Sequence, residues 1–182
     1  MIPEFPQFKK IEISDKKDVE KFTSKYPPYS DFNFISLWSW DIKGEMRLSI
    51  LNGNLVVRFT DYLTSEPFYS FLGDKKVNET AEKLLELSKE EGVKLRLKLV
   101  PENSIKNIDT SKFKVEEDRD NFDYIYEIPI LAEFRGSSYQ SHRNSVRQFL
   151  KKYKNWEVKM IDFSEIYNKN SIISLFTQWI KN

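Results

Sequence analysis

The chain contains 182 residues with a mass of 21.8 kDa, enough for one ordinary domain and part of a second. Its 29 Lys and Arg residues balance 28 Asp and Glu residues, and a net charge of +1 argues against a wholly basic nucleic-acid coat. The lack of cysteine excludes disulfides, thiol nucleophiles and cysteine-based metal sites. With His142 as the single histidine, we expect no bound metal and no Ser–His triad.

The sequence also carries no membrane or export signal. No run of about 18 apolar residues occurs that could span a bilayer. The first ten residues, MIPEFPQFKK, lack the apolar centre of a signal peptide. We therefore expect a cytoplasmic protein.

The first 40 residues predict a strand and two helices. Residues 8–13 are typical of a short strand, and Asp15 is a suitable N-cap for a helix that ends before Pro27. A second helix is predicted over residues 29–40, capped by Ser30 or Asp31. Its aromatic residues recur at helical spacing, so we expect Trp38 and Trp40 to belong to the core.

A β-hairpin is the clearest local signal. Apolar and polar residues alternate over 46–50 and again over 55–59, with Asn52 and Gly53 between the two runs. Asn-Gly favours this turn because both residues accept a positive φ. A third strand is predicted over residues 67–72.

Helix and strand then alternate. Asp74 is expected to cap a helix that Gly92 ends, and strict alternation over 93–99 predicts a strand with one buried face. Two more strands are predicted at 113–117 and 122–128. If the last of these lies beside 93–99, the cations of one can pair with the acids of the other, namely Lys94, Arg96 and Lys98 with Asp123 and Glu127.

The pattern changes after Pro129. A helix is predicted over 136–153, a strand over 156–161, and a last helix after Ser164 or Ser171. That last helix places Ile172, Phe176 and Trp179 on one face, with no later element to cover them. We expect a second domain or a partner chain to bury this face.

The order of elements up to residue 128 is the topology of the GCN5-related N-acetyltransferase fold, an α/β fold with a mixed sheet and helices on both faces. We therefore predict an acetyltransferase-like domain at 1–128, a connecting basic helix at 129–154, and the first elements of a second such domain at 155–182.

Three segments resemble one known family: PPYSDFNFISLWSW at 27–40, EEDRDNFDYIY at 116–126 and RGSSYQSHRNSVRQFLKKY at 135–153. It is the family of the C-terminal, cytosolic part of phosphatidylglycerol lysyltransferases. The resemblance implies two acetyltransferase-like domains in tandem and transfer of an aminoacyl group from a charged tRNA to a lipid head group. The chain matches the first domain and the opening of the second, so we expect the catalytic half to lie largely outside it. No catalytic residue is identified. The alternative is a non-catalytic binding or scaffolding domain that engages a polyanion or a partner subunit.

The acyl-coenzyme A site of this fold is not expected here. Such a site binds pyrophosphate on a Gly-rich turn at the start of the central helix, where backbone N–H groups favour an anion. The corresponding turn, residues 71–76, has a single glycine and places the carboxylate of Asp74 where phosphate would lie. We expect a structural helix start and no cofactor.

The best candidate binding surface is basic. Residues 135–154 contain six cations and no acid, and Arg143, Arg147 and Lys151 step by four along one helix face. Such a row can bind a phosphate backbone, so tRNA or anionic lipid head groups are the expected partners. It can equally be a solvated surface, or pair with the acidic string at 116–123, which itself is more typical of a solvated turn than of a metal loop.

Overall fold

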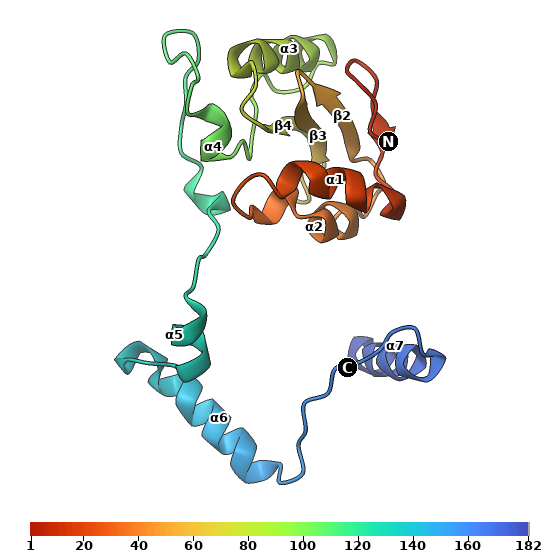
Figure 1. The fold of residues 1–182 in the computed structure, drawn as a ribbon, viewed down its shortest axis with the longest axis vertical. Helices are drawn as coiled ribbons and strands as arrows, with labels where there is room; N and C mark the ends of the chain where they lie inside the picture. The colour runs from red at the N-terminus through yellow and green to blue at the C-terminus, as the bar shows by residue number, and fades with distance from the viewer. Residues whose placement is uncertain (182) are drawn as a thin grey trace. The chain divides into compact units, whose positions relative to one another are not determined.

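The structure, a computed structural model, describes residues 1–181. The chain forms two compact units, the first over residues 1–124 and the second from Ile125 onward. Figure 1 shows each unit's elements. The predicted division at 1–128, 129–154 and 155–182 stays a prediction.

A four-stranded antiparallel sheet is the centre of the first unit. Its strands pair in sequence order and comprise β1 (Lys9–Lys10), β2 (Arg47–Leu51), β3 (Asn54–Thr60) and β4 (Pro67–Leu72). The predicted hairpin is confirmed, because Leu51 pairs with Asn54 across the turn. The turn residues Asn52 and Gly53 have φ values of 55° and 79°, as a two-residue Asn-Gly turn requires.

Helices cover both faces of this sheet. Helices α1 (Lys16–Thr23) and α2 (Phe34–Ser39) lie on one side, and α3 (Val77–Glu90) lies on the other (Figure 1). One apolar cluster joins the first face to the helices through residues that include Val19, Phe32, Leu37, Leu48 and Val57. A second cluster joins the other face to α3 through Val56, Tyr69, Phe71, Val77 and Leu84. Burial of both sheet faces therefore fixes a three-layer α/β arrangement.

The remaining elements are short or belong to the second unit. In the first unit they are the 3-10 turns Ile13–Asp15, Ser30–Phe32 and Arg119–Asn121 and the one-turn helix α4 (Glu102–Ile105). The second unit contains α5 (Ile128–Glu133), a 3-10 turn at Ser137–Tyr139, α6 (Gln140–Lys152) and α7 (Ile166–Ile180). The apolar side chains of α7 that were expected to lack cover, Ile172, Phe176 and Trp179, are exposed.

The predicted strand over 93–99 is wrong. This segment makes one isolated parallel bridge, Tyr69 with Leu97, supported by a 3.2 Å hydrogen bond from the Lys98 N–H to the Tyr69 carbonyl. Leu99 has a φ of 57°, which breaks an extended run, and Leu95 is 65% exposed. The left-handed backbone at Leu99 and the exposed Leu95 interrupt the pairing with β4, so the alternating pattern does not form a strand here.

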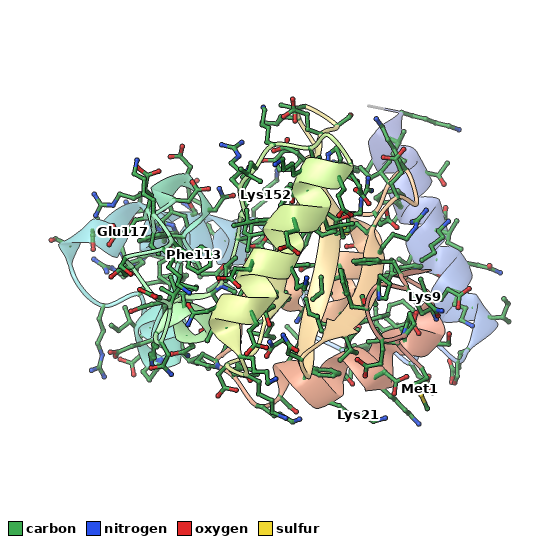
Figure 2. All side chains as sticks on the ribbon, turned by 90° about the horizontal axis from the view of Figure 1, so that it is seen from above. Met1, Lys9, Lys21, Phe113, Glu117 and Lys152 are labelled. Atoms are coloured by element: carbon green, nitrogen blue, oxygen red, sulfur yellow. The ribbon has the colours of Figure 1, made fainter. Side chains whose placement is uncertain are left out.

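The strands predicted at 113–117, 122–128 and 156–161 are also wrong, since these segments carry no strand in the part of the chain described. Figure 2 shows Phe113 and Glu117 away from the sheet. The expected mixed sheet is therefore an antiparallel one, with parallel contacts limited to two isolated bridges.

Three expected helix features near the N-terminus are corrected as well. The carboxylate of Asp15 accepts from the Glu12 N–H at 3.0 Å and pairs with Lys9 at 2.7 Å instead of capping α1. Helix α2 is capped by Asn33, whose side-chain oxygen accepts from the Ile35 N–H at 2.9 Å. Trp38 and Trp40, expected in the core, are exposed. A surface helix buries one face, and in α2 that face is formed by Phe34 and Leu37.

We predict that two leucine substitutions separate this fold from the expected one. Leu48→Ala removes a fully buried side chain on β2 and should lower the free energy of unfolding by about 2–5 kcal/mol. Leu95→Ala should change it by less than about 0.5 kcal/mol, because Leu95 is exposed. Urea denaturation measures both. If Leu95→Ala lowered the free energy of unfolding as much as Leu48→Ala, Leu95 would be buried and the predicted strand over 93–99 would be supported.

Candidate functional site

The turn that leads from β4 into α3 is the segment that the sequence analysis compared with an acyl-carrier site. Gly73 has a φ of 150°, and a Cβ there would lie 2.1 Å from the Asn54 Oδ1 atom. Its N–H donates to the Oγ of Ser104 at 3.1 Å. Because Gly73 has no Cβ, the side chain of Asn54 can pack directly against it. The Gly73 N–H is already hydrogen-bonded to Ser104.

That side chain is the buried amide of Asn54. Its Nδ2 donates to the Lys75 carbonyl at 2.7 Å and to the Thr80 Oγ1 at 3.0 Å, while its Oδ1 accepts from the Lys75 N–H at 3.1 Å. The side chain of Asn54 thus hydrogen-bonds to both the N–H and the carbonyl of Lys75 in the turn. An entering pyrophosphate would have to displace these hydrogen bonds.

Asp74 does not cap α3, which corrects the sequence prediction. The N-cap position is Lys76, in the left-handed conformation with a φ of 43°. Asp74 instead accepts from the hydroxyl of Tyr26 at 3.3 Å. Burial and then the Asp74 carboxylate raise the pKa of Tyr26. The carboxylate therefore stays at the turn, where it opposes an anionic ligand.

The carboxylates of Asp31 and Asp123 interact just before α2. The Ser30 N–H donates to Asp123 at 3.1 Å. Burial, and after it the charge of Asp123, raises the pKa of Asp31. The acidic string is therefore joined to the Ser30 backbone of the same unit through Asp123. In residues 1–181, no group of three or more His, Cys, Asp or Glu side chains has the arrangement of a metal site.

The cations of the 93–99 segment find partners other than the ones expected. Lys94 pairs with Glu66, and Lys98 pairs with Asp61 at 3.3 Å, both acids coming from the β3–β4 connection. The predicted pairing with Asp123 and Glu127 is wrong because 122–128 is not a neighbouring strand.

The candidate basic residues of α6 have unlike environments. Arg143 is half-buried, and its guanidinium donates to the carbonyls of Phe134 and Gly136 and to the side chain of Gln140. The Gly136 and Gln140 contacts measure 2.7 and 2.6 Å. Phe134 and Gly136 both have positive φ, so Arg143 holds together the bend between α5 and α6. Arg143 therefore forms no ion pair with the acidic string, and its hydrogen bonds go to the protein.

Arg147 and Lys151 lie on the exposed surface of α6, and neither has an ion pair or hydrogen bond among the side chains of residues 1–181. Lys152 lies 5.2 Å from the Tyr153 ring, and Arg135 pairs with Glu133. Of the three predicted binding residues, Arg147 and Lys151 therefore remain available to an anion.

His142, the single histidine, packs against two aromatic rings. Its ring centroid lies 5.6 Å from that of Phe134 and 5.7 Å from that of Tyr139. Among residues 1–181, no carboxylate and no serine hydroxyl is hydrogen-bonded to the imidazole, as an acid–base pair or triad would require. The contacts give His142 a packing role in the bend before α6.

Comparison with known proteins identifies the family. The model of the phosphatidylglycerol lysyltransferase C-terminal domain matches residues 24–182. The chain belongs to this family. A solved structure of a conserved protein of unknown function from Bacteroides thetaiotaomicron is similar, with a TM-score of 0.73 and 24% sequence identity. The match covers 100% of this chain and 60% of that protein, so the chain spans about three fifths of its length. No curated protein matches.

The sequence reasoning missed Asn54 altogether. The only signal was its place after the Asn-Gly turn, where a polar residue begins a strand that is otherwise apolar.

Within residues 1–181, no helix is both long and apolar enough to cross a bilayer.

We predict that the protein does not bind acetyl-coenzyme A. Isothermal titration should give no binding heat. The reason is that the N–H groups of Gly73 and Lys75 already donate to Ser104 and Asn54 and are not free to bind phosphate. Lys75→Ala is the matched variant, as Lys75 is the nearest cation within the turn. Micromolar affinity that this substitution abolishes would show that the turn is a coenzyme site after all.

We predict that Asp31→Asn stabilises the protein at neutral pH. The raised pKa means that ionised Asp31 is disfavoured in the folded state, so its contribution worsens as the pH rises through the ordinary value of 3.8 and the higher folded value. The melting temperature of Asp31→Asn should exceed the wild-type value at pH 7 and converge with it below the ordinary value. Asp120→Asn, at an exposed acid of the string that contains Asp123, should show no such gain. An equal gain at every pH would contradict the explanation.

Proposed function

We propose that the chain is the N-terminal part of an aminoacyl or acyl transferase of the phosphatidylglycerol lysyltransferase type, and that this part binds a polyanion and does not itself carry out the transfer. Family membership over residues 24–182 supports the relation. A role with aminoacyl-tRNA fits a cytoplasmic protein.

An acetyltransferase-like fold over residues 1–128 is part of the proposal. Helix α3 leaves the sheet after β4, and the chain returns to form a parallel bridge between Tyr69 and Leu97. The chain after α3 therefore lies beside β4 in the parallel sense that a β–α–β crossover would give, although it forms one bridge and no strand. Residues 155–182 are proposed to begin a second such domain, whose remainder or a partner chain covers the exposed apolar side of α7.

The absence of catalysis rests on the turn before α3. Asn54 occupies its backbone groups, and Asp74 adds a negative charge. An acyl carrier with a pyrophosphate would meet occupied donors and a like charge there. The first unit is accordingly proposed to serve a binding role.

The polyanion surface is proposed to be the exposed side of α6. The observation that carries it is that Arg147 and Lys151, one helical turn apart, remain without protein partners in residues 1–181. Phosphates of tRNA or of anionic lipid head groups would neutralise these cations and release counterions. Arg143 supports the surface indirectly, since its contacts to Phe134 and Gly136 hold the helix start in place.

A scaffolding role is the second candidate. The apolar side chains Val146, Phe149 and Leu150 of α6 are exposed, as are those along α7. An amphipathic helix of this kind also suits docking to a partner subunit. The two roles differ in what charge reversal at Arg147 and Lys151 should do. It should weaken tRNA binding if α6 binds a polyanion, and should leave tRNA binding unchanged if α6 docks a partner subunit.

We predict that Arg147→Glu combined with Lys151→Glu weakens tRNA retention on filters and lowers the slope of log affinity against log salt by about one per lost contact. The melting temperature should stay unchanged, because both side chains are exposed. Lys169→Glu on α7 is the control with an equally exposed cation.

Arg143→Glu has a different expected result, since it removes the hydrogen bonds to the bend before α6. It should lower the melting temperature through loss of structure in the second unit. If the Arg147 and Lys151 double variant binds tRNA with wild-type affinity and salt slope, the polyanion surface is elsewhere and the scaffolding role gains support.

A further inference from the structure

The Asn-Gly pair in the turn between β2 and β3 is chemically reactive. Asn52-Gly53 is the single Asn-Gly pair of the sequence. The backbone nitrogen that follows an asparagine can attack its side-chain amide, and glycine hinders this attack least because it has no Cβ. Gly53 is exposed and Asn52 is half-buried, so solvent reaches the pair. The residues that make the hairpin turn are therefore also those most open to spontaneous deamidation.

The fold restrains the side chain of Asn52. Its Nδ2 donates to the Oγ1 of Thr80 at 3.0 Å. Thr80 is fully buried on α3, and the same Oγ1 accepts from the Nδ2 of Asn54 at 3.0 Å. The amide of Asn52 is thus bound to the helix that packs on the sheet.

The backbone of the turn is restrained as well. Asn52 and Gly53 both have positive φ, and Leu51 pairs with Asn54 on either side of them. Before deamidation can occur, the amide of Asn52 must rotate until its Cγ faces the Gly53 nitrogen. This rotation breaks the hydrogen bond to Thr80, so that hydrogen bond opposes the reaction.

We propose that Asn52 is a deamidation site whose rate is set by the hydroxyl of Thr80. The Gly53 nitrogen forms a bond to the Asn52 Cγ while the Cγ–Nδ2 bond breaks, and the proton of the Gly53 N–H leaves with the released ammonia. The product is a cyclic succinimide. Water then adds to either of its carbonyls and opens the ring, which gives aspartate or isoaspartate in place of Asn52.

The two products have unequal effects on the first unit. Aspartate keeps the length of the main chain, whereas isoaspartate carries the chain through Cβ and adds an atom to a turn of two residues. The added atom conflicts with the register that pairs Leu51 with Asn54. Because Asn54 contacts the Lys75 backbone from this position, isoaspartate should also loosen the turn before α3.

Deamidation of Asn52 is independent of the proposed function. It takes place in the first unit and needs no ligand, whereas the proposed polyanion surface lies on α6 in the second unit. The test below uses no tRNA and no lipid, so either proposal can fail without the other.

The test follows the conversion of Asn52 in the full chain at neutral pH by mass spectrometry. Trypsin cuts after Arg47 and Arg58 and releases residues 48–58, which carry the whole turn. Fragmentation separates conversion of Asn52 from that of Asn54, and chromatography separates aspartate from isoaspartate. The unfolded reference is the same chain in guanidinium chloride. A sample taken at time zero corrects for conversion during digestion.

We expect folded wild-type protein to convert about tenfold more slowly than the unfolded chain, because the hydrogen bond to Thr80 must first break. Thr80→Val removes the hydroxyl and should convert about fivefold faster than folded wild type. Thr80→Ser retains the hydroxyl and should convert at the wild-type rate.

Ser88→Ala is the matched control, because it removes another buried hydroxyl of α3, one that donates to the Leu84 carbonyl. It should leave the conversion rate of Asn52 unchanged. Melting curves establish that each variant is folded, and Thr80→Ala replaces Thr80→Val if the latter does not fold.

Four results would overturn the proposal. If the unfolded chain does not convert at Asn52, the site is absent. If folded wild type converts as fast as the unfolded chain, the fold does not restrain Asn52. Equal rates for folded wild type and Thr80→Val would remove the role of Thr80. Acceleration by Thr80→Ser or Ser88→Ala to the rate of Thr80→Val would assign the restraint to the packing of α3 and not to the hydroxyl.

Discussion

The buried amide of Asn54 is the interaction on which the first unit depends. It stands at the first position of β3, contacts both backbone groups of Lys75, and donates to Thr80 on α3. One side chain thereby fixes the hairpin, the turn and the helix relative to one another. Leaving these buried groups without partners would cost about 1–3 kcal/mol for each. The same contacts fill the position at which Gly73 would otherwise let an anion approach.

The function proposed for the chain follows from this use of the turn. At the turn before α3, where helix N–H groups would favour an anion, the Asn54 amide contacts the Lys75 backbone and Asp74 adds a carboxylate. The cations that we propose to bind a polyanion, Arg147 and Lys151, lie on a different helix and have no protein partners among residues 1–181. The membership of the chain in the phosphatidylglycerol lysyltransferase C-terminal family accords with a surface that meets phosphate.

Local signals in the sequence were reliable where one short segment determines its own structure. The Asn52-Gly53 hairpin and α3 follow from turn chemistry and helical periodicity, and both are present. The alternation over 93–99 failed because the left-handed backbone at Leu99 interrupts the pairing with β4, which the alternating pattern does not reveal. Arg143 was grouped with two other cations by spacing alone, and only the positive φ values of the bend before α6 explain why its guanidinium turns inward. Asn54 carried no motif, since its role arises from a contact between residues far apart in sequence.

The most direct test of the central claim is a map of backbone amide shifts by NMR as tRNA is added. The account predicts that the signals of α6, from residue 140 to 152, move while those of Gly73, Lys75 and the Asn54 side chain stay in place. Shifts that begin at Gly73 and Lys75 and leave α6 unchanged would place the anion at the turn before α3 and contradict the account.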